Sequence, residues 1–141
     1  MRVHAPRPAP VDLVVDTSAL VALLLDEPSA SVVMDEFDRT SGPVMSAANL
    51  LELLIVADAR GGSRGADEAR GLVDDLEVVV VPADPNVVAD AHRAWQRFGR
   101  GSHPAALNFG DCFGYALASA YEVPLLCLGD DFRRTDLVVR P

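Results

Sequence analysis

The sequence predicts an α/β domain of three layers, in which a central, mostly parallel β-sheet is covered by helices on both faces. Short apolar stretches rich in β-branched residues alternate with longer stretches of helical periodicity over the 141 residues. No turn signal typical of a β-hairpin joins two of the apolar stretches. Parallel strands need helical crossovers, and these crossovers bury both faces of the sheet. One domain over 11–141 is the natural expectation for a chain of this length.

The first ordered elements are a strand and two helices. The apolar stretch at 11–15 predicts a buried strand because it contains β-branched residues and ends on an acid. The next stretch, 17–25, predicts a helix that Thr17 or Ser18 can cap. A second helix is expected at 29–39, where apolar residues recur at helical spacing.

A short strand and two further helices come next. Residues 44–45 predict a very short strand, and Ser46 can cap the helix that follows at 47–60. Glycines at 61 and 62 end that helix, as glycines commonly do at helix C-termini. A weaker helix is expected at 66–76.

The second half opens with the clearest strand of the chain, EVVVV at 77–81. Asp84 and the proline after it open a helix. Because Trp95 lies on the apolar stripe of this helix, it is predicted to be a core residue rather than a platform for base stacking. The segment 99–107 is predicted to be a loop. The stripe consists of Val88, Ala91, Trp95 and Phe98.

The C-terminal part predicts one more helix and two more strands. The helix starts at Asn108 or Asp111 and runs to Tyr121. A strand at 125–128 follows it, then the turn GDDF and a final short strand at 137–139. In parallel sheets, ligands bind beyond the carboxyl ends of the strands, so residues that directly follow a strand are candidates for a functional site.

Composition limits the kinds of site that the chain can form. The formal net charge is -9 at pH 7, and all 12 basic residues are arginine, since the sequence contains no lysine. A Schiff-base lysine and a P-loop are therefore excluded. A phosphate-bearing partner would need a local basic patch or a metal ion to approach so acidic a chain.

The cysteines and the N-terminus predict a cytoplasmic location. Cys112 and Cys127 lie in apolar stretches without CxxC spacing, which favours buried, reduced thiols. The segment 1–10 predicts a loose arm rather than a signal peptide, because it lacks an apolar core. No window approaches the roughly 20 apolar residues of a membrane span.

Four acidic residues stand in unusually apolar surroundings. A structural role alone could explain three of them. Asp16 could be no more than a helix cap, Asp111 could complement a helix dipole, and Asp130 or Asp131 could be a turn residue. Glu52, inside LLELL, is explained by neither a cap nor a turn, and a glutamate is almost never fully buried without a partner.

Taken together, these acids predict a metal site. Asp16 and Asp130 follow strand ends on the same edge of a parallel sheet, and Asp111 opens the helix that leads to the second of these strands. Carboxylates brought this close repel one another or take up protons unless a cation joins them. The donors are all oxygen, and the histidines are scattered, which favours Mg²⁺ or Mn²⁺ over zinc. Such ions serve phosphodiester chemistry, singly or in pairs.

Four motifs in this order and spacing resemble a PIN domain, and specifically the VapC toxins of VapBC toxin–antitoxin systems. They are VVDTSALVALLLDEP, SAANLLEL, LNFGDCFGYALA and LLCLGDDF, and the resemblance spans residues 12 to about 139. It implies a Mg²⁺- or Mn²⁺-dependent endoribonuclease, related in fold to flap nucleases. It also implies a homodimer that is inhibited by a small VapB antitoxin, whose C-terminal segment covers the acidic pocket.

The resemblance also assigns the site residues. By motif position, Asp16, Glu52 and Asp111 correspond to the family's catalytic and metal-binding acids. The fourth acid is placed on Asp130, with Asp131 as the second choice, because an aspartate before that phenylalanine often has a structural role.

Arginines could form an RNA-binding rim around this pocket, although solvated or paired surface arginines explain them equally well. Three of them follow helical spacing and two follow the fourth acid: Arg93, Arg97, Arg100, Arg133 and Arg134.

The rival interpretation is a PIN-like protein-interaction module without nuclease activity. Retention of all the acids argues against it, because a site without chemistry gains nothing from buried charge. Receiver and phosphatase-like domains are disfavoured, since both need a lysine near their acids and this chain has none.

Overall fold

Five parallel strands form the centre of the molecule. The computed structural model describes residues 10–141, so the predicted N-terminal arm lies, apart from Pro10, outside the described residues. All four strand pairings are parallel, in the order β3-β2-β1-β4-β5, which confirms the predicted sheet. The strands are β1 (Leu13–Val15), β2 (Pro43–Ser46), β3 (Val79–Val81), β4 (Leu125–Leu126) and β5 (Val139–Arg140).

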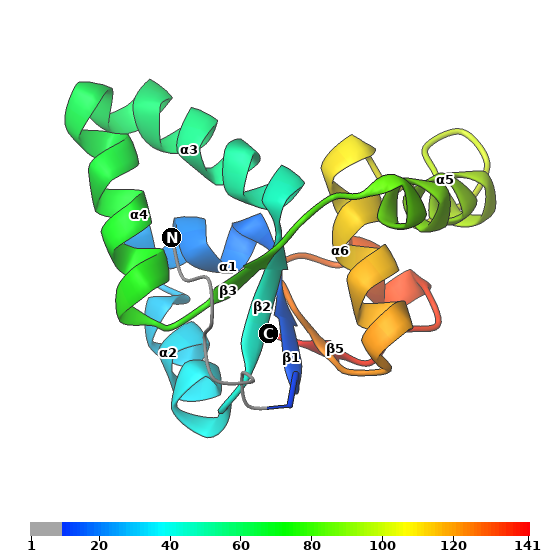
Figure 1. The fold of residues 1–141 in the computed structure, drawn as a ribbon, viewed down its shortest axis with the longest axis horizontal. Coiled ribbons are helices and arrows are strands. Elements are labelled where there is room, and N and C mark those ends of the chain that lie inside the picture. The colour runs from blue at the N-terminus through cyan, green and yellow to red at the C-terminus, as the bar shows by residue number, and fades with distance from the viewer. Residues whose placement is uncertain (1–9) are drawn as a thin grey trace.

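Helices cover both faces of this sheet, as the sequence predicts. Figure 1 shows α1 to α4 on one side of the strands and α5 and α6 on the other. The bounds of the α-helices are α1 (Thr17–Leu24), α2 (Ala30–Arg39), α3 (Ala47–Gly61), α4 (Gly65–Asp75), α5 (Pro85–Phe98) and α6 (Phe109–Tyr121), and those of the 3₁₀-helices are η1 (Gly62–Arg64) and η2 (Asp131–Arg134).

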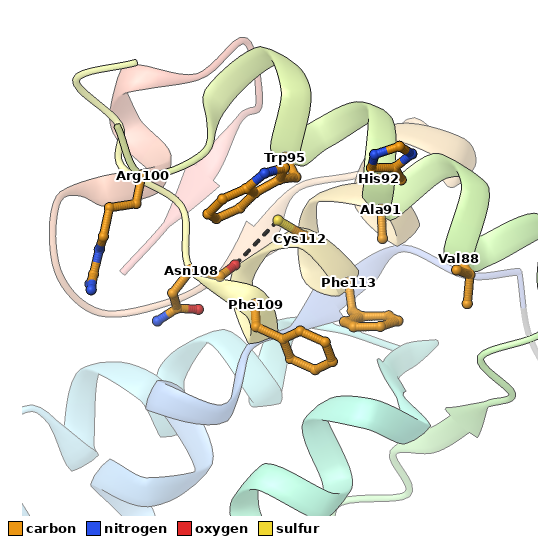
Figure 2. Close-up of a pocket in the computed structure, with 9 residues that line it drawn as sticks. All are labelled: Val88, Ala91, His92, Trp95, Arg100, Asn108, Phe109, Cys112 and Phe113. Atoms are coloured by element: carbon orange, nitrogen blue, oxygen red, sulfur yellow. Dashed lines mark hydrogen bonds between the residues drawn. The ribbon is translucent and has the colours of Figure 1, made fainter. Parts of the chain in front are cut away.

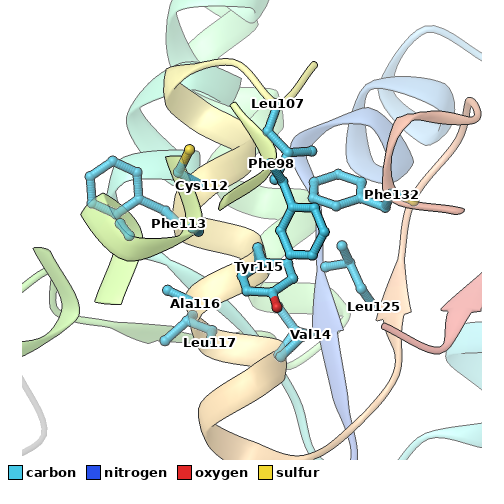
Figure 3. Packing of buried hydrophobic residues seen from close by; sticks show 14 of the residues in the cluster. Val14, Phe98, Leu107, Cys112, Phe113, Tyr115, Ala116, Leu117, Leu125 and Phe132 are labelled. Carbon is cyan, nitrogen blue, oxygen red and sulfur yellow. The ribbon is translucent and has the colours of Figure 1, made fainter. Parts of the chain in front are cut away.

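The alternation of side chains along the strands separates the core into two clusters. Val14 and Leu125 pack with α5 and α6, and part of this cluster is drawn in Figure 3. Val15 and Leu126 point to the opposite face and pack with α1 to α4. Successive strand residues face opposite sides of the sheet. All three residues of β1 are buried, so this strand packs against the helices on both faces.

The predicted strand at 77–81 is confirmed as β3, which lies at the sheet edge with Val79 44% exposed. One prediction about burial is wrong. On α5, Ala91 and Phe98 are buried as expected, whereas Trp95 is 41% exposed. The reason is that α5 packs on α6 through small residues and Phe98, which leaves the indole at the flank of the contact.

The two cysteines confirm the burial prediction, since Cys112 and Cys127 are both buried free thiols. Burial raises the pKa of Cys112 to about 11 and that of Cys127 to about 12, so neither is a ready nucleophile at neutral pH. Among the described helices, none combines the length and apolar character needed to cross a membrane.

The carboxyl ends of the central strands converge on one region. The backbone N–H of Asp16, directly after β1, donates to the carbonyl of Leu126 at 2.9 Å. The N–H of Leu128, after β4, donates to the Ser18 hydroxyl at 2.9 Å. These bonds hold the start of α1 against the turn that follows β4, and thereby define the edge where the predicted acids should meet.

Candidate active site

Asp16 is a buried carboxylate at the start of α1, with 7% of its surface exposed. Its Oδ2 accepts hydrogen bonds from the Ser18 N–H at 3.1 Å and the Ser18 hydroxyl at 2.7 Å. Asp16 itself is therefore the helix cap, in place of the predicted Thr17 or Ser18. Burial raises the pKa of Asp16 and the nearby charge of Glu52 raises it further, while the Ser18 hydrogen bonds oppose both effects.

Glu52 is fixed by a buried amide that the sequence analysis did not single out. The Asn49 side chain is 0% exposed, and its Nδ2 donates to the Gly110 carbonyl at 3.0 Å and to Glu52 Oε1 at 3.4 Å. The Thr17 hydroxyl donates to the Asn49 carbonyl at 3.1 Å. One residue thus ties α3 to both α1 and α6. Its only signal in the sequence is a lone amide three positions before a glutamate in an apolar helix.

The orientation of the Asn49 amide follows from its partners. A carbonyl can only accept, so the atom that faces the Gly110 carbonyl must be the nitrogen. The other end, Oδ1, is buried and has no hydrogen-bond partner among the described residues. A buried acceptor without a donor is costly and calls for a water or an ion's hydration shell.

Two glycines of α6 make room for these oxygens. A Cβ placed on Gly110 would lie 2.5 Å from Glu52 Oε2, so only glycine lets this carboxylate rest against the helix backbone. A Cβ on Gly114 would lie 3.8 Å from Asn49 Oδ1 and 3.9 Å from Asp16 Oδ1. These residues therefore face the same side of α6, one helical turn apart.

Asp111 completes the group from the first turn of α6. Its Oδ2 accepts from the Asn108 N–H at 3.0 Å, and its own N–H donates to Asn108 Oδ1 at 2.9 Å, which is a reciprocal capping box. Burial raises the pKa of Asp111 to about 6, opposed by the Asn108 hydrogen bond and reinforced by the charges of Asp16, Asp131 and Glu52. Asp111 therefore has two roles: it takes part in the capping box of α6, and it lies near the other acids.

The fourth predicted acid, Asp130, does not face the others. Its side chain is 86% exposed and lies 3.9 Å from Arg133. Asp131 instead contributes one of the negative charges that raise the pKa of Asp111. Both aspartates are exposed, at the start of η2. The charge of Asp131 at Asp111 favours the second choice for the fourth acid.

The donor set suits a hydrated magnesium-type ion better than a direct four-acid cage. Within residues 10–141, no three His, Cys, Asp or Glu side chains are grouped closely enough to hold an ion together. Magnesium commonly binds one or two carboxylates and keeps its remaining waters. The unpartnered Asn49 Oδ1 and the space left by Gly114 fit such waters. The oxygen donors present therefore fit such an ion, which some of the acids would reach through its waters.

The predicted arginine rim is largely paired with other groups. Arg97 pairs with Asp136 at 3.3 Å and lies over the Phe98 ring, and Arg134 donates to the Pro104 carbonyl at 3.1 Å. Because α5 ends at Phe98, Arg100 does not continue the helix face of Arg93 and Arg97. Arg93 pairs with Asp90 and Arg133 lies near Asp130.

The sequence is similar to a family of known proteins. A family model described as PIN domain matches residues 13–138. Ribonuclease VapC of Mycolicibacterium smegmatis is 42% identical over 89% of this chain and 97% of its own length.

Two solved structures share the fold. The crystal structure of Mycobacterium tuberculosis VapC20, a toxin that cleaves the sarcin–ricin loop, has a TM-score of 0.76 at 19% identity and covers 92% of this chain and 100% of its own. The DNA-bound VapBC complex from Salmonella typhimurium has a TM-score of 0.71 at 15% identity, covering 92% of this chain and 97% of its own.

Proposed function

Because the chain belongs to the PIN-domain family and, within it, to the VapC ribonucleases of VapBC toxin–antitoxin systems, we propose that it is an endoribonuclease toxin that requires Mg²⁺ or Mn²⁺. The proposal is supported by the charges of Glu52 on Asp16, and of Asp16 and Glu52 on Asp111, which act across the starts of α1, α3 and α6. The pKa values of Asp16 and Asp111 are raised by burial and by these neighbouring charges, and no lysine exists to neutralise them. A divalent cation is the counter-charge that this arrangement needs.

Each residue of the site has a definite task in this proposal. Asp16 and Asp111 would hold the ion, and Glu52 and Asp131 would bind its waters. When bound, the ion polarises the RNA phosphodiester and lowers the pKa of the attacking water. Ser18 and Asn108 fix the two aspartates through hydrogen bonds, and Asn49 fixes Glu52. Preorganised oxygens of this kind lose little orientational freedom when the ion and substrate arrive.

A protein partner belongs to the same proposal. VapBC is a family of toxin–antitoxin systems, so we assign a VapB-type antitoxin to this chain, and we also propose that it pairs with a second copy of itself. Leu51 and Ile55, one turn apart on α3, are 59% and 60% exposed. Adjacent apolar residues at the surface are typical of such interfaces. Cleavage of RNA would place the protein in the cytoplasm, in agreement with its reduced cysteines.

The test is metal-dependent cleavage by the purified chain without antitoxin. We expect total RNA to be cut with Mg²⁺ or Mn²⁺ and not with a chelator, and mapping of the new ends would identify the substrate. Asp111→Asn should reduce the cleavage rate by at least about 100-fold, the scale of a lost catalytic group. Metal-independent cleavage, or an active Asp111→Asn protein, would remove the ion or that residue from the mechanism.

The two neighbouring aspartates of the turn provide a matched comparison. Asp131→Asn should lower the cleavage rate, because Asp131 contributes to the field at Asp111. Asp130→Asn should leave it unchanged, because that side chain is 86% exposed and faces Arg133. The reverse result would return the fourth position to Asp130. A chain that cleaves no RNA under any of these conditions would instead support the protein-interaction module.

A further inference from the structure

We propose that the pocket between α5 and α6 binds a nucleobase of the RNA next to the cleaved bond and thereby determines where the chain cuts; this inference rests on the proposed function. The pocket measures about 450 Å³, within the range of small-molecule sites. Its lining combines aromatic rings with a few polar groups, and Figure 2 shows Trp95 from α5 opposite Phe109 and Phe113 from α6. The other lining residues are Val88, Ala91, His92, Arg100, Asn108 and Cys112.

The aromatic rings are unusually exposed for a chain with few of them. Phe109 is 77% exposed and Trp95 is 41% exposed, although both are large apolar groups that usually lie inside. Phe109 also contacts Phe113 edge to face, with ring centroids 5.3 Å apart. Exposed rings of this kind are suited to stacking on a base, because every base presents a π-face.

The charge of the lining distinguishes a nucleotide from other apolar occupants. The chain carries a net charge of -9, yet no acidic residue lines this pocket and Arg100 does. No ion pair joins Arg100 to an acid within the part of the chain that the structure describes. A guanidinium beside stacked rings can contact the phosphate that follows a base.

Asn108 belongs both to the pocket lining and to the hydrogen bonds that hold Asp111. The N–H of Arg100 donates to the Leu107 carbonyl at 3.0 Å, which places Arg100 at the same end of the pocket as Asn108. Asn108 Oδ1 is already occupied by the Asp111 N–H, so the Nδ2 of this amide is the end left for a base edge. Asn108 and Asp111 are three residues apart, a rise of roughly 4.5 Å along the helix axis. A phosphate at the acids therefore has its neighbouring base within reach of the pocket.

Trp95 provides a direct probe because it is the only tryptophan in the chain. The fluorescence of the full chain, in Mg²⁺ and without antitoxin, would be titrated with the four nucleoside monophosphates, which contain no bond to cleave. We expect saturable quenching by at least one of them at millimolar concentration. Ribose 5-phosphate, which lacks a base, should leave the emission unchanged.

Variants separate stacking from general effects. Phe109→Ala should weaken the nucleotide binding by about 5- to 100-fold, the range for loss of one stacking partner, and should alter the base preference beside the mapped cut sites. Tyr121→Ala is the control, since Tyr121 is an exposed aromatic at the far end of the same helix. Arg100→Gln should also weaken binding, whereas Arg39→Gln on α2, where Arg39 pairs with Glu36, should not.

Each outcome decides between the two proposals. If the chain cleaves RNA but nucleotides leave Trp95 unchanged and Phe109→Ala keeps the same cut sites, the base pocket is disproved and the nuclease stands. If nucleotides quench Trp95 but no RNA is cleaved, the pocket stands and the proposed function fails. If the emission changes with protein concentration or with antitoxin and not with nucleotides, a protein covers the pocket, and the inference is overturned.

Discussion

Asp111 has a structural and an electrostatic role. Its carboxylate accepts the Asn108 N–H in the capping box of α6, and neighbouring negative charges disfavour its ionised form. Burial and the charges of Asp16, Asp131 and Glu52 raise its pKa from 3.8 to about 6. Between these values the folded chain binds a proton that the unfolded chain has released. The free energy of unfolding therefore falls as the pH rises from about 4 to about 6.

This leads to a prediction for Asp111→Asn in the presence of a chelator. The amide keeps an acceptor for the Asn108 N–H but carries no charge, so the variant should be more stable than the wild type at pH 7. Partial solvent exposure reduces the gain to roughly 1–2 kcal/mol. The advantage should disappear near pH 4, where the wild type is protonated as well. Thermal melts across this range test it, and an equal difference at every pH would contradict it.

Asn49 is the second residue on which the site depends, because its side chain joins α3 to α6. It is fully buried and bonds both to Glu52 and to the Gly110 carbonyl. Asn49→Ala should lower the free energy of unfolding by roughly 1–3 kcal/mol, because it leaves a buried carbonyl without its donor. It should also slow cleavage by releasing Glu52. Asn86→Ala, an exposed amide on α5, is the control and should change neither; a full-strength Asn49→Ala nuclease would show that Glu52 needs no support.

At the scale of elements, the close approach of α3 to α6 depends on glycine. A Cβ on Gly110 would collide with the end of the Glu52 side chain at 2.5 Å, which can move more easily than backbone. Gly110→Ala should therefore displace this carboxylate and lower the cleavage rate about 10-fold or more, with little loss of thermal stability.

A glycine elsewhere gives the matched control for this variant. Gly71 lies within α4 and a Cβ there would meet nothing within 4 Å. Gly71→Ala should raise the free energy of unfolding by about 0.5–1 kcal/mol through helix propensity and leave cleavage unchanged. A Gly110→Ala protein that behaves like Gly71→Ala would mean that Glu52 does not work from its observed position.

The elements themselves were largely predictable, because each depends on local signals. The carboxyl ends of β1 and β3, the Ser46 cap and the end of α3 at Gly61 and Gly62 lie where the sequence predicts them, whereas β4 ends at Leu126, two residues before the predicted end. The exposure of Trp95 was not predictable. Helical spacing identifies an apolar stripe, but it does not show how much of that stripe the neighbouring helix will cover. The edge position of β3 depends on strand order, which the pattern of one strand does not contain.

At the scale of the molecule, the sequence predicts a shared site because a parallel sheet gathers its strand ends on one edge. Asp16 and Asp130 were assigned by this argument, whereas Glu52 was assigned by its apolar surroundings and by motif. The distinction between Asp130 and Asp131 depends on the folded position of η2 relative to α6, and the Asn49 contacts depend on how α3 and α6 pack. Both are tertiary details that leave only a faint trace in a single sequence.

The whole molecule also determines how a divalent ion should act on stability. The folded chain gathers repelling carboxylates that the unfolded chain keeps apart, so an ion that binds them binds the folded state preferentially. Mg²⁺ or Mn²⁺ at ten times its dissociation constant should then stabilise the wild type by about 1.4 kcal/mol. A monovalent salt at equal ionic strength controls for screening of the net charge of -9.

The variant that separates the two effects is the double substitution Asp16→Asn with Glu52→Gln. It removes ligands but leaves most of the net charge, so screening persists while specific binding is lost. We expect its melting temperature to respond equally to divalent and monovalent salt, whereas the wild type responds more to the divalent ion. If the double variant keeps the full divalent response, the ion binds outside this site, and the carboxylates at the strand ends then have no counter-charge to explain their convergence.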